Sequence, residues 1–129
     1  GVDHFRRRQN MNAQLQGIDL TDSWVLGWRE SDGSLEFGVE FSLRPESAFY
    51  RTPKKDEWTC YRRGFLRFDG VTAVDGLKKE EAVRFTIDPD GSKDFGNIES
   101  FEEEDGRVLL SGDFGDVVVE CSSWKVDVE

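Results

Sequence analysis

The stretch from Leu35 to Leu43, LEFGVEFSL, constrains the fold more than any other part of the chain. Its apolar residues occupy every second position, and glutamate, glycine or serine fills the positions between them. Because successive side chains of a β-strand point to opposite faces, this alternation predicts a strand with one buried and one solvated face. The residues expected in the core are Leu35, Phe37, Val39, Phe41 and Leu43.

The segment before this strand predicts its partner. SWVLGWRE, residues 23–30, also has apolar residues at alternate positions, which predicts a second strand with a buried face. The Asp32-Gly33 pair between the two segments is a strong signal for a tight hairpin turn. We therefore predict an antiparallel hairpin over residues 23–43 that brings Trp28 close to Leu35. The residues expected on the buried face of the first strand are Trp24, Leu26 and Trp28.

The rest of the chain continues as short strand-like segments. After residue 82 they recur at intervals of roughly ten residues, separated by Pro-Asp-Gly, Glu-Asp-Gly and Phe-Gly-Asp sequences. Helices that would connect parallel strands are missing from the pattern, and only residues 75–82 suggest a helical turn. We predict an all-β fold, either an antiparallel sandwich or a partly open barrel, of about eight to ten short strands.

Four finer predictions concern individual strands. Residues 14–20 are expected to form a strand rather than a helix, and residues 82–88 are expected to form another strand. Residues 57–70 predict one long strand with a bulge or bend at Gly64, since glycine inside a strand often marks such a site. The run Val117–Val119 lacks alternation, which predicts a strand buried on both faces.

The length of 129 residues suits one domain, which we assign to residues 11–129. Residues 1–10 differ from the rest and are interpreted as an added or flexible leader, with Met11 as the natural start. Their Arg6-Arg7-Arg8 run leaves open the alternative of a basic arm that binds an acidic partner.

The formal net charge of −10, from 27 acidic and 17 basic residues, restricts the choice of partners. Nucleic acid and anionic membranes would be repelled, whereas a protein with a basic surface would be attracted. The sequence has no apolar run near the ~18–20 residues that span a bilayer. We therefore expect a soluble, cytoplasmic protein. Cys60 and Cys121 are expected to be free thiols there, and a disulfide between neighbouring strands remains the alternative for an exported protein.

The residues needed for common kinds of catalysis are scarce. His4 is the one histidine, and no phosphate-binding glycine loop occurs, so we expect neither an enzyme nor a cofactor. The segment Asp88–Glu99, DPDGSKDFGNIE, superficially resembles an EF-hand calcium loop. However, Lys93 stands where the loop needs its glycine, and strand patterns flank it instead of helices. We predict a Pro-Asp-Gly turn without a metal ion.

Basic residues gather on the strand around Gly64. If Gly64 bends the strand, Arg63 and Arg67 are expected on one outward face, where they alternate with Tyr61 and Phe65. Interleaved arginine and aromatic residues are typical of platforms for single-stranded nucleic acid. Because the net charge opposes that function, we favour a salt-bridged outer face that balances acidic neighbours.

Three segments together resemble small bacterial all-β proteins: LTDSWVLGW (20–28), LEFGVEFSL (35–43) and CYRRGFLRFDGV (60–71). The same strand pattern resembles that of some immunity proteins of polymorphic toxin systems. The resemblance covers residues 20–71 and rests on the order of strands and turns. It implies a binding function without catalysis, and it assigns no functional residue.

These observations favour a small acidic, non-catalytic protein-interaction module, in its specific form an immunity-type inhibitor of a basic toxin. The candidate partner-binding face consists of Glu102, Glu103, Glu104, Asp113 and Asp116. The alternative is a β-barrel that binds a small apolar ligand in an aromatic cavity. That cavity would be lined by Trp24, Trp28, Phe37 and Phe41.

Overall fold

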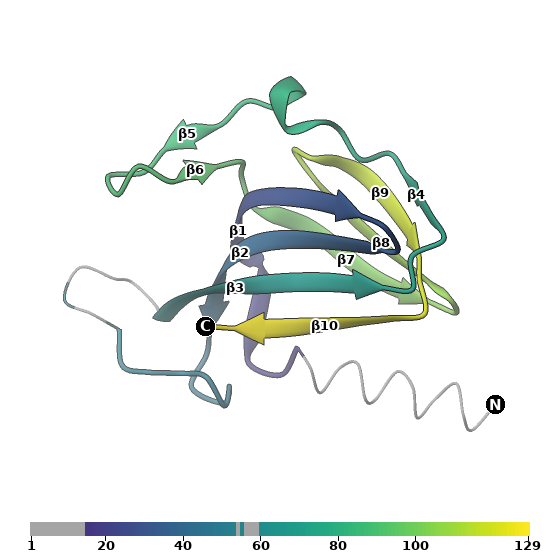
Figure 1. Cartoon of the computed structure of the whole chain (residues 1–129). Coiled ribbons are helices and arrows are strands. Elements are labelled where there is room, and N and C mark those ends of the chain that lie inside the picture. The colour runs from purple at the N-terminus through teal and green to yellow at the C-terminus, as the bar shows by residue number, and fades with distance from the viewer. Residues whose placement is uncertain (1–14, 54, 56–59) are drawn as a thin grey trace.

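The structure, a computed structural model, describes residues 15–53, 55 and 60–129. In this part of the chain ten strands form two four-stranded antiparallel sheets and one separate two-stranded hairpin. Sheet A has the strand order β1-β2-β3-β10, and sheet B has the order β4-β9-β8-β7. The two sheets pack as an open sandwich, with sheet A in front of sheet B in Figure 1. The all-β prediction is confirmed, and the sandwich is the correct one of its two forms.

The strands of sheet A are β1 (Ile18–Ser31), β2 (Ser34–Leu43), β3 (Cys60–Asp69) and β10 (Ser123–Val128). Those of sheet B are β4 (Ala73–Asp75), β7 (Ile98–Glu104), β8 (Arg107–Gly112) and β9 (Gly115–Glu120). The separate hairpin pairs β5 (Thr86–Ile87) with β6 (Lys93–Asp94), and a single 3₁₀ turn covers Glu80–Ala82. Residues 75–82, for which the sequence left a loop or a single helical turn open, form a connection that ends in this 3₁₀ turn. The strand expected over residues 82–88 is reduced to the two residues of β5.

The first hairpin has the predicted register. Ser31 pairs with Ser34 at its end, and the turn lies at Asp32-Gly33 as expected. The five alternating apolar residues of β2 are all completely buried. Trp28 pairs with Phe37, so it lies diagonally across from Leu35 rather than opposite it. The strand expected in residues 14–20 is present at residues 18–20, where it forms the start of β1, and residues 15–17 form a turn before it.

Trp24 does not share the buried face of Trp28, and this prediction was wrong. The pairing of β1 with β2 is irregular between Val25 and Gly27, which moves the side chains before this point to the other face. Val25 is therefore fully buried, whereas Trp24 lies on the surface and is 37% exposed. The backbone of Trp24 also forms an isolated antiparallel bridge with Asn97.

Two other strand predictions also need correction. β3 pairs with β2 and β10 in unbroken register through Gly64, so the predicted bulge or bend is absent there. Gly64 instead allows β10 to approach closely, because a Cβ atom at this position would overlap the backbone of Asp127. In β9, Val117 and Val119 are buried but Val118 is only partly buried, so one face of this strand is open to solvent.

Aromatic rings fill the space between the sheets. Phe37 lies 5.1 Å from Phe114 and 6.3 Å from Phe68, measured between ring centroids. Trp28 lies 5.0 Å from Phe95, and its indole N–H donates a hydrogen bond to the Lys78 carbonyl oxygen at 2.9 Å. Tilted and edge-on ring pairs of this kind add about 0.5–1.5 kcal/mol each beyond the burial of their area. The core is therefore packed and aromatic.

The segment Asp88–Glu99 begins as a tight turn between β5 and β6. The Asp88 amide donates to the Ser92 carbonyl oxygen, and Gly91 has a φ of 88°, which favours glycine. In Figure 1 this hairpin extends beside β1 rather than joining either sheet. The predicted Pro-Asp-Gly turn between strands is confirmed.

The thiols of Cys60 and Cys121 are both free, as predicted. Cys60 is buried, and Cys121 is half-buried. Among the described residues, no helix has the length and apolar character to cross a membrane.

Candidate acidic binding face

Sheet B turns one face to solvent, and carboxylates are concentrated on it. Along β9, alternation buries Val117 and Val119 and leaves Asp116, Val118 and Glu120 on the outside. The neighbouring strands extend this outward face through cross-strand pairing. We call these outward positions the acidic face: Ala73, Asp75, Ser100, Glu102, Glu104, Arg107, Leu109, Ser111, Asp116, Val118 and Glu120.

The centre of the acidic face is apolar. Leu109 pairs with Val118 across β8 and β9, and both side chains are only partly buried. Glu102 and Asp75 continue this row on either side, so a carboxylate stands at each end of the apolar pair. A shallow hollow of about 270 Å³ runs over Leu109 and Val118, with Glu102 and Asp116 in its lining. An apolar centre with a charged rim is the usual arrangement of a protein-binding surface.

The carboxylates of this face are mostly unbalanced. Arg107 is its one basic residue, and the guanidinium is paired with Glu104 at 2.7 Å. Within the described residues Asp75, Glu102 and Asp116 have no ion-pair partner, and the same holds for Glu120. These four side chains are exposed, so they project negative charge into solvent.

The structure brings together three of the five residues predicted for a partner-binding face. Glu102, Glu104 and Asp116 lie on the acidic face. Glu103 has the opposite orientation, because it alternates with its neighbours along β7, and it lines a different hollow. Asp113 lies in the turn between β8 and β9, beyond the last paired row.

Sequence reasoning missed Asp75, Glu120 and the apolar pair of Leu109 and Val118. The alternation within RVLLSG and GDVVVE could have placed Leu109 and Val118 on an outward face. The position of Asp75 depends on the pairing of β4 with β9, which joins segments distant in the sequence.

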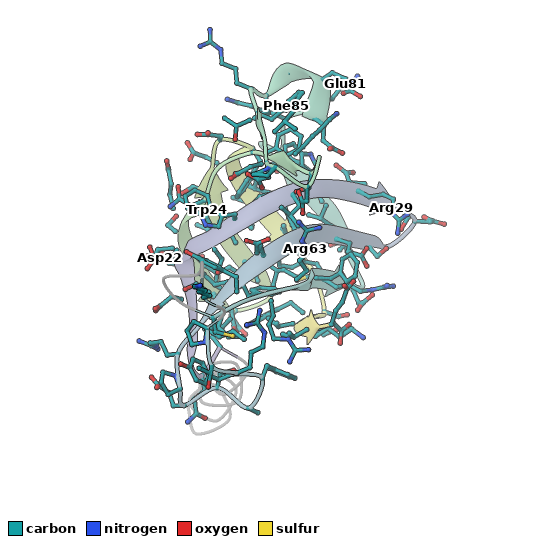
Figure 2. The ribbon with its side chains drawn as sticks, turned by 90° about the vertical axis from the view of Figure 1, so that its left-hand side faces the viewer. Asp22, Trp24, Arg29, Arg63, Glu81 and Phe85 are labelled. Carbon is teal, nitrogen blue, oxygen red and sulfur yellow. The ribbon has the colours of Figure 1, made fainter. Side chains whose placement is uncertain are left out.

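The outward face of sheet A has a different electrostatic character. Figure 2 views β1 and β2 from outside the sandwich and shows Trp24, Arg29 and Arg63 on that side, with Phe85 above them. The guanidinium of Arg63 is paired with Glu40 at 3.4 Å and also with Asp90. The other basic side chains of this face are paired as well: Arg29 with Glu36, Arg67 with Glu36 and Asp69, and Lys125 with Asp127.

The predicted salt-bridged outer face around Arg63 and Arg67 is thereby confirmed. Its arginines are already engaged by carboxylates of the same protein, so few positive charges remain for a nucleic-acid backbone. On the acidic face of sheet B, by contrast, Asp75, Glu102, Asp116 and Glu120 have no ion-pair partner among the described residues.

The four residues proposed to line an apolar cavity do not surround a common space. Phe37 and Phe41 are fully buried, and Phe37 is surrounded by the rings of Trp28, Phe68 and Phe114. Trp24 lies on the outer surface. The packed rings occupy the volume that a ligand would need.

Among the residues that the structure describes, no group of three or more histidine, cysteine or acidic side chains is arranged to hold a metal ion. The chain matches no protein-family model, no curated protein and no solved structure. The functional conclusion therefore rests on the geometry and charge of the surface.

Proposed function

We propose that this protein is a non-catalytic interaction module that binds a basic protein through the acidic face. The observation that carries the proposal is the row Glu102–Leu109–Val118–Asp75, in which an apolar pair lies between two carboxylates without ion-pair partners among the described residues. A basic partner would cover the apolar pair and would neutralise the surrounding carboxylates.

The specific form of the proposal is an immunity-type inhibitor of a basic toxin that acts in the cytoplasm. Inhibition of this kind requires a rigid surface and no chemistry, and a sandwich with a packed aromatic core supplies such a surface. The strand pattern of residues 20–71, which resembles some immunity proteins, supports the same function. Free thiols at Cys60 and Cys121 suit a reducing compartment.

Site-specific photo-crosslinking in the native host tests the proposal. A photoreactive residue replaces Ser100 on the acidic face, and the matched control replaces Ser31 at the end of the first hairpin. Each serine is exposed and shares a hydroxyl hydrogen bond with one cross-strand serine, so the two substitutions disturb the fold similarly.

The expected result is one basic protein captured at position 100 and not at position 31. The captured protein is then purified, and its binding to the unmodified chain is measured directly. Capture of the same protein at both positions, or of a protein with an acidic surface, would contradict the proposal.

A further inference from the structure

A second hollow lies at the end of the sandwich where the β7–β8 turn meets the connection from β9 to β10. Its volume is about 400 Å³, and its lining includes Glu103, Arg107, Val108, Cys121 and Trp124. The hollow is separate from the acidic face, because Glu103 points to the side of β7 opposite to Glu102. It adjoins that face through Glu104 and Arg107, which belong to both.

Glu103 carries an oxygen whose hydrogen-bonding capacity is unused. Its Oε2 atom is withdrawn from solvent and has no hydrogen-bond partner among the described residues. Buried polar atoms are nearly always hydrogen-bonded, and leaving one unpaired costs about 1–3 kcal/mol. Glu103 lines the hollow, and the terminal torsion of glutamate is broad, so its carboxylate can reorient to meet a ligand there.

The cation nearest in the lining is already engaged. Arg107 donates from both Nε and Nη2 to Oε2 of Glu104, each at 2.7 Å. Because this pair is balanced, Glu103 leaves the hollow with one uncompensated negative charge. The remaining lining is mixed: Val108 and Trp124 lie at its base and are almost completely buried, whereas Gly106, Ser122 and Ser123 add polar groups.

A carboxylate with an unused acceptor oxygen at a hollow of about 400 Å³ matches the charged end of a long basic side chain. The aliphatic stem packs on apolar surface, and the charged end donates to the carboxylate. Arginine fits a single carboxylate better than lysine, because its planar guanidinium donates two parallel hydrogen bonds to the two oxygens.

We propose that this hollow receives an arginine side chain of the basic partner, with Glu103 as the carboxylate that binds it. The inference rests on the proposed function for the protein that supplies the arginine. The hollow would then hold one side chain of the partner at the edge of the acidic face. A few buried residues usually supply most of the affinity of an interface, and arginine is one of the residue types enriched among them.

Cys121 provides a reporter within the hollow. Its thiol is free and half-buried, and burial followed by the charges of Glu103 and Asp69 raises its pKa. A ligand in the hollow covers this thiol and slows its alkylation. Cys60 is completely buried and serves as the internal control for an intact fold.

The experiment measures alkylation of both cysteines in the full chain by peptide mass spectrometry. The probe is N-acetyl-arginine amide at ~10 mM, since a single side chain binds with a dissociation constant on the order of millimolar. N-acetyl-citrulline amide is the neutral control of the same shape, and N-acetyl-lysine amide distinguishes a guanidinium from an ammonium. Sodium chloride keeps the ionic strength equal in all samples.

We expect the arginine probe to slow alkylation of Cys121 about twofold or more, the lysine probe to slow it less, and the citrulline probe to leave it unchanged. Glu103→Gln should abolish this protection, whereas Glu102→Gln should retain it. Rates are compared with and without the probe within each variant, because removing the charge of Glu103 alters the thiol itself. Slow alkylation of Cys60 in every variant confirms that the protein is folded.

Three results would overturn the pocket: no protection by arginine, equal protection by citrulline, or protection that persists in Glu103→Gln. This assay uses no protein partner, so its failure is distinct from failure of the proposed function. If a basic protein is captured at position 100 but the arginine probe does not protect Cys121, the arginine pocket is contradicted and the proposed function is retained. If the arginine probe protects Cys121 but no basic protein is captured, the proposed function is contradicted, and the hollow is retained only as a pocket that binds arginine.

Discussion

Gly64 on β3 lies directly against Asp127 on β10, so closely that a Cβ atom at position 64 would overlap the Asp127 carbonyl oxygen. Gly64→Ala must therefore push the two strands apart where they pair. We expect a loss of at least about 1–3 kcal/mol in the free energy of unfolding, the usual cost of overpacking a tight site. Urea denaturation followed by tryptophan fluorescence measures it.

Gly38 on the neighbouring strand is the matched control. It has no positive φ, and a Cβ atom there would meet its nearest neighbours at 3.9 Å, an ordinary contact. Gly38→Ala should change stability by less than about 0.5 kcal/mol. Equal destabilisation by the two substitutions would show that close approach is not the reason for glycine at position 64.

Phe37 tests the aromatic core. The side chain is completely buried and contacts the rings of Trp28, Phe68 and Phe114. Phe37→Ala leaves a cavity and should cost about 3–5 kcal/mol of unfolding free energy. Phe85→Ala, at a ring that is 43% exposed, should cost much less. Similar costs in the same denaturation assay would contradict the packed core.

The segment Asp88–Glu99 is predicted not to bind calcium. Asp90 accepts hydrogen bonds from Ser92 and is paired with Arg63, and Asp94 accepts one from the Gly96 amide, so two of its carboxylates are already engaged. Millimolar calcium should leave the melting temperature unchanged. A ligand present at ~100 times its dissociation constant would add about 2.7 kcal/mol. Calorimetry that detects micromolar binding, lost in Asp88→Ala, would contradict this.

Asp90 should titrate at unusually low pH. Hydrogen bonds from the Ser92 hydroxyl and amide, and then the charge of Arg63, lower its pKa from 3.8 to about 2. Folding therefore favours the ionised carboxylate, and this contribution is present above the ordinary pKa and disappears as the pH falls toward about 2. Carbon NMR of the carboxyl group measures the pKa directly. Ser92→Ala should raise it, and a value near 3.8 in the unmodified protein would refute the hydrogen-bonded turn.

The first hairpin could be predicted because its information is local. Each apolar residue of β2 is buried by its own position in the alternation, and the Asp32-Gly33 turn determines the register. Trp24 was misplaced because the irregularity between Val25 and Gly27 interrupts the period of two. The sequence shows a glycine at such a point but not whether the pairing slips there. Gly64 shows the converse, a strand glycine that preserves the register and permits close approach.

The candidate site was predicted only in part because charge alone does not determine orientation. Glu102, Glu103 and Glu104 are consecutive in a strand, so they cannot all face the same side. Asp75 and Glu120 join the acidic face through the pairing of β4 with β9, a contact between distant segments. No local pattern reveals which strands become neighbours.

Reversal of charge on the acidic face should slow association with the partner captured through Ser100. Glu102→Lys/Asp116→Lys is expected to lower the on-rate at low salt by about tenfold and to change the dissociation rate much less. Added salt should reduce the difference, because exposed charges are screened beyond ~8–10 Å. Asp22→Lys/Glu30→Lys, at two exposed positions on β1 in the other sheet, changes the net charge equally away from this face. Stopped-flow measurements compare the two variants. Equal slowing by both would assign the effect to net charge, and the acidic face would then have no specific function in recognition.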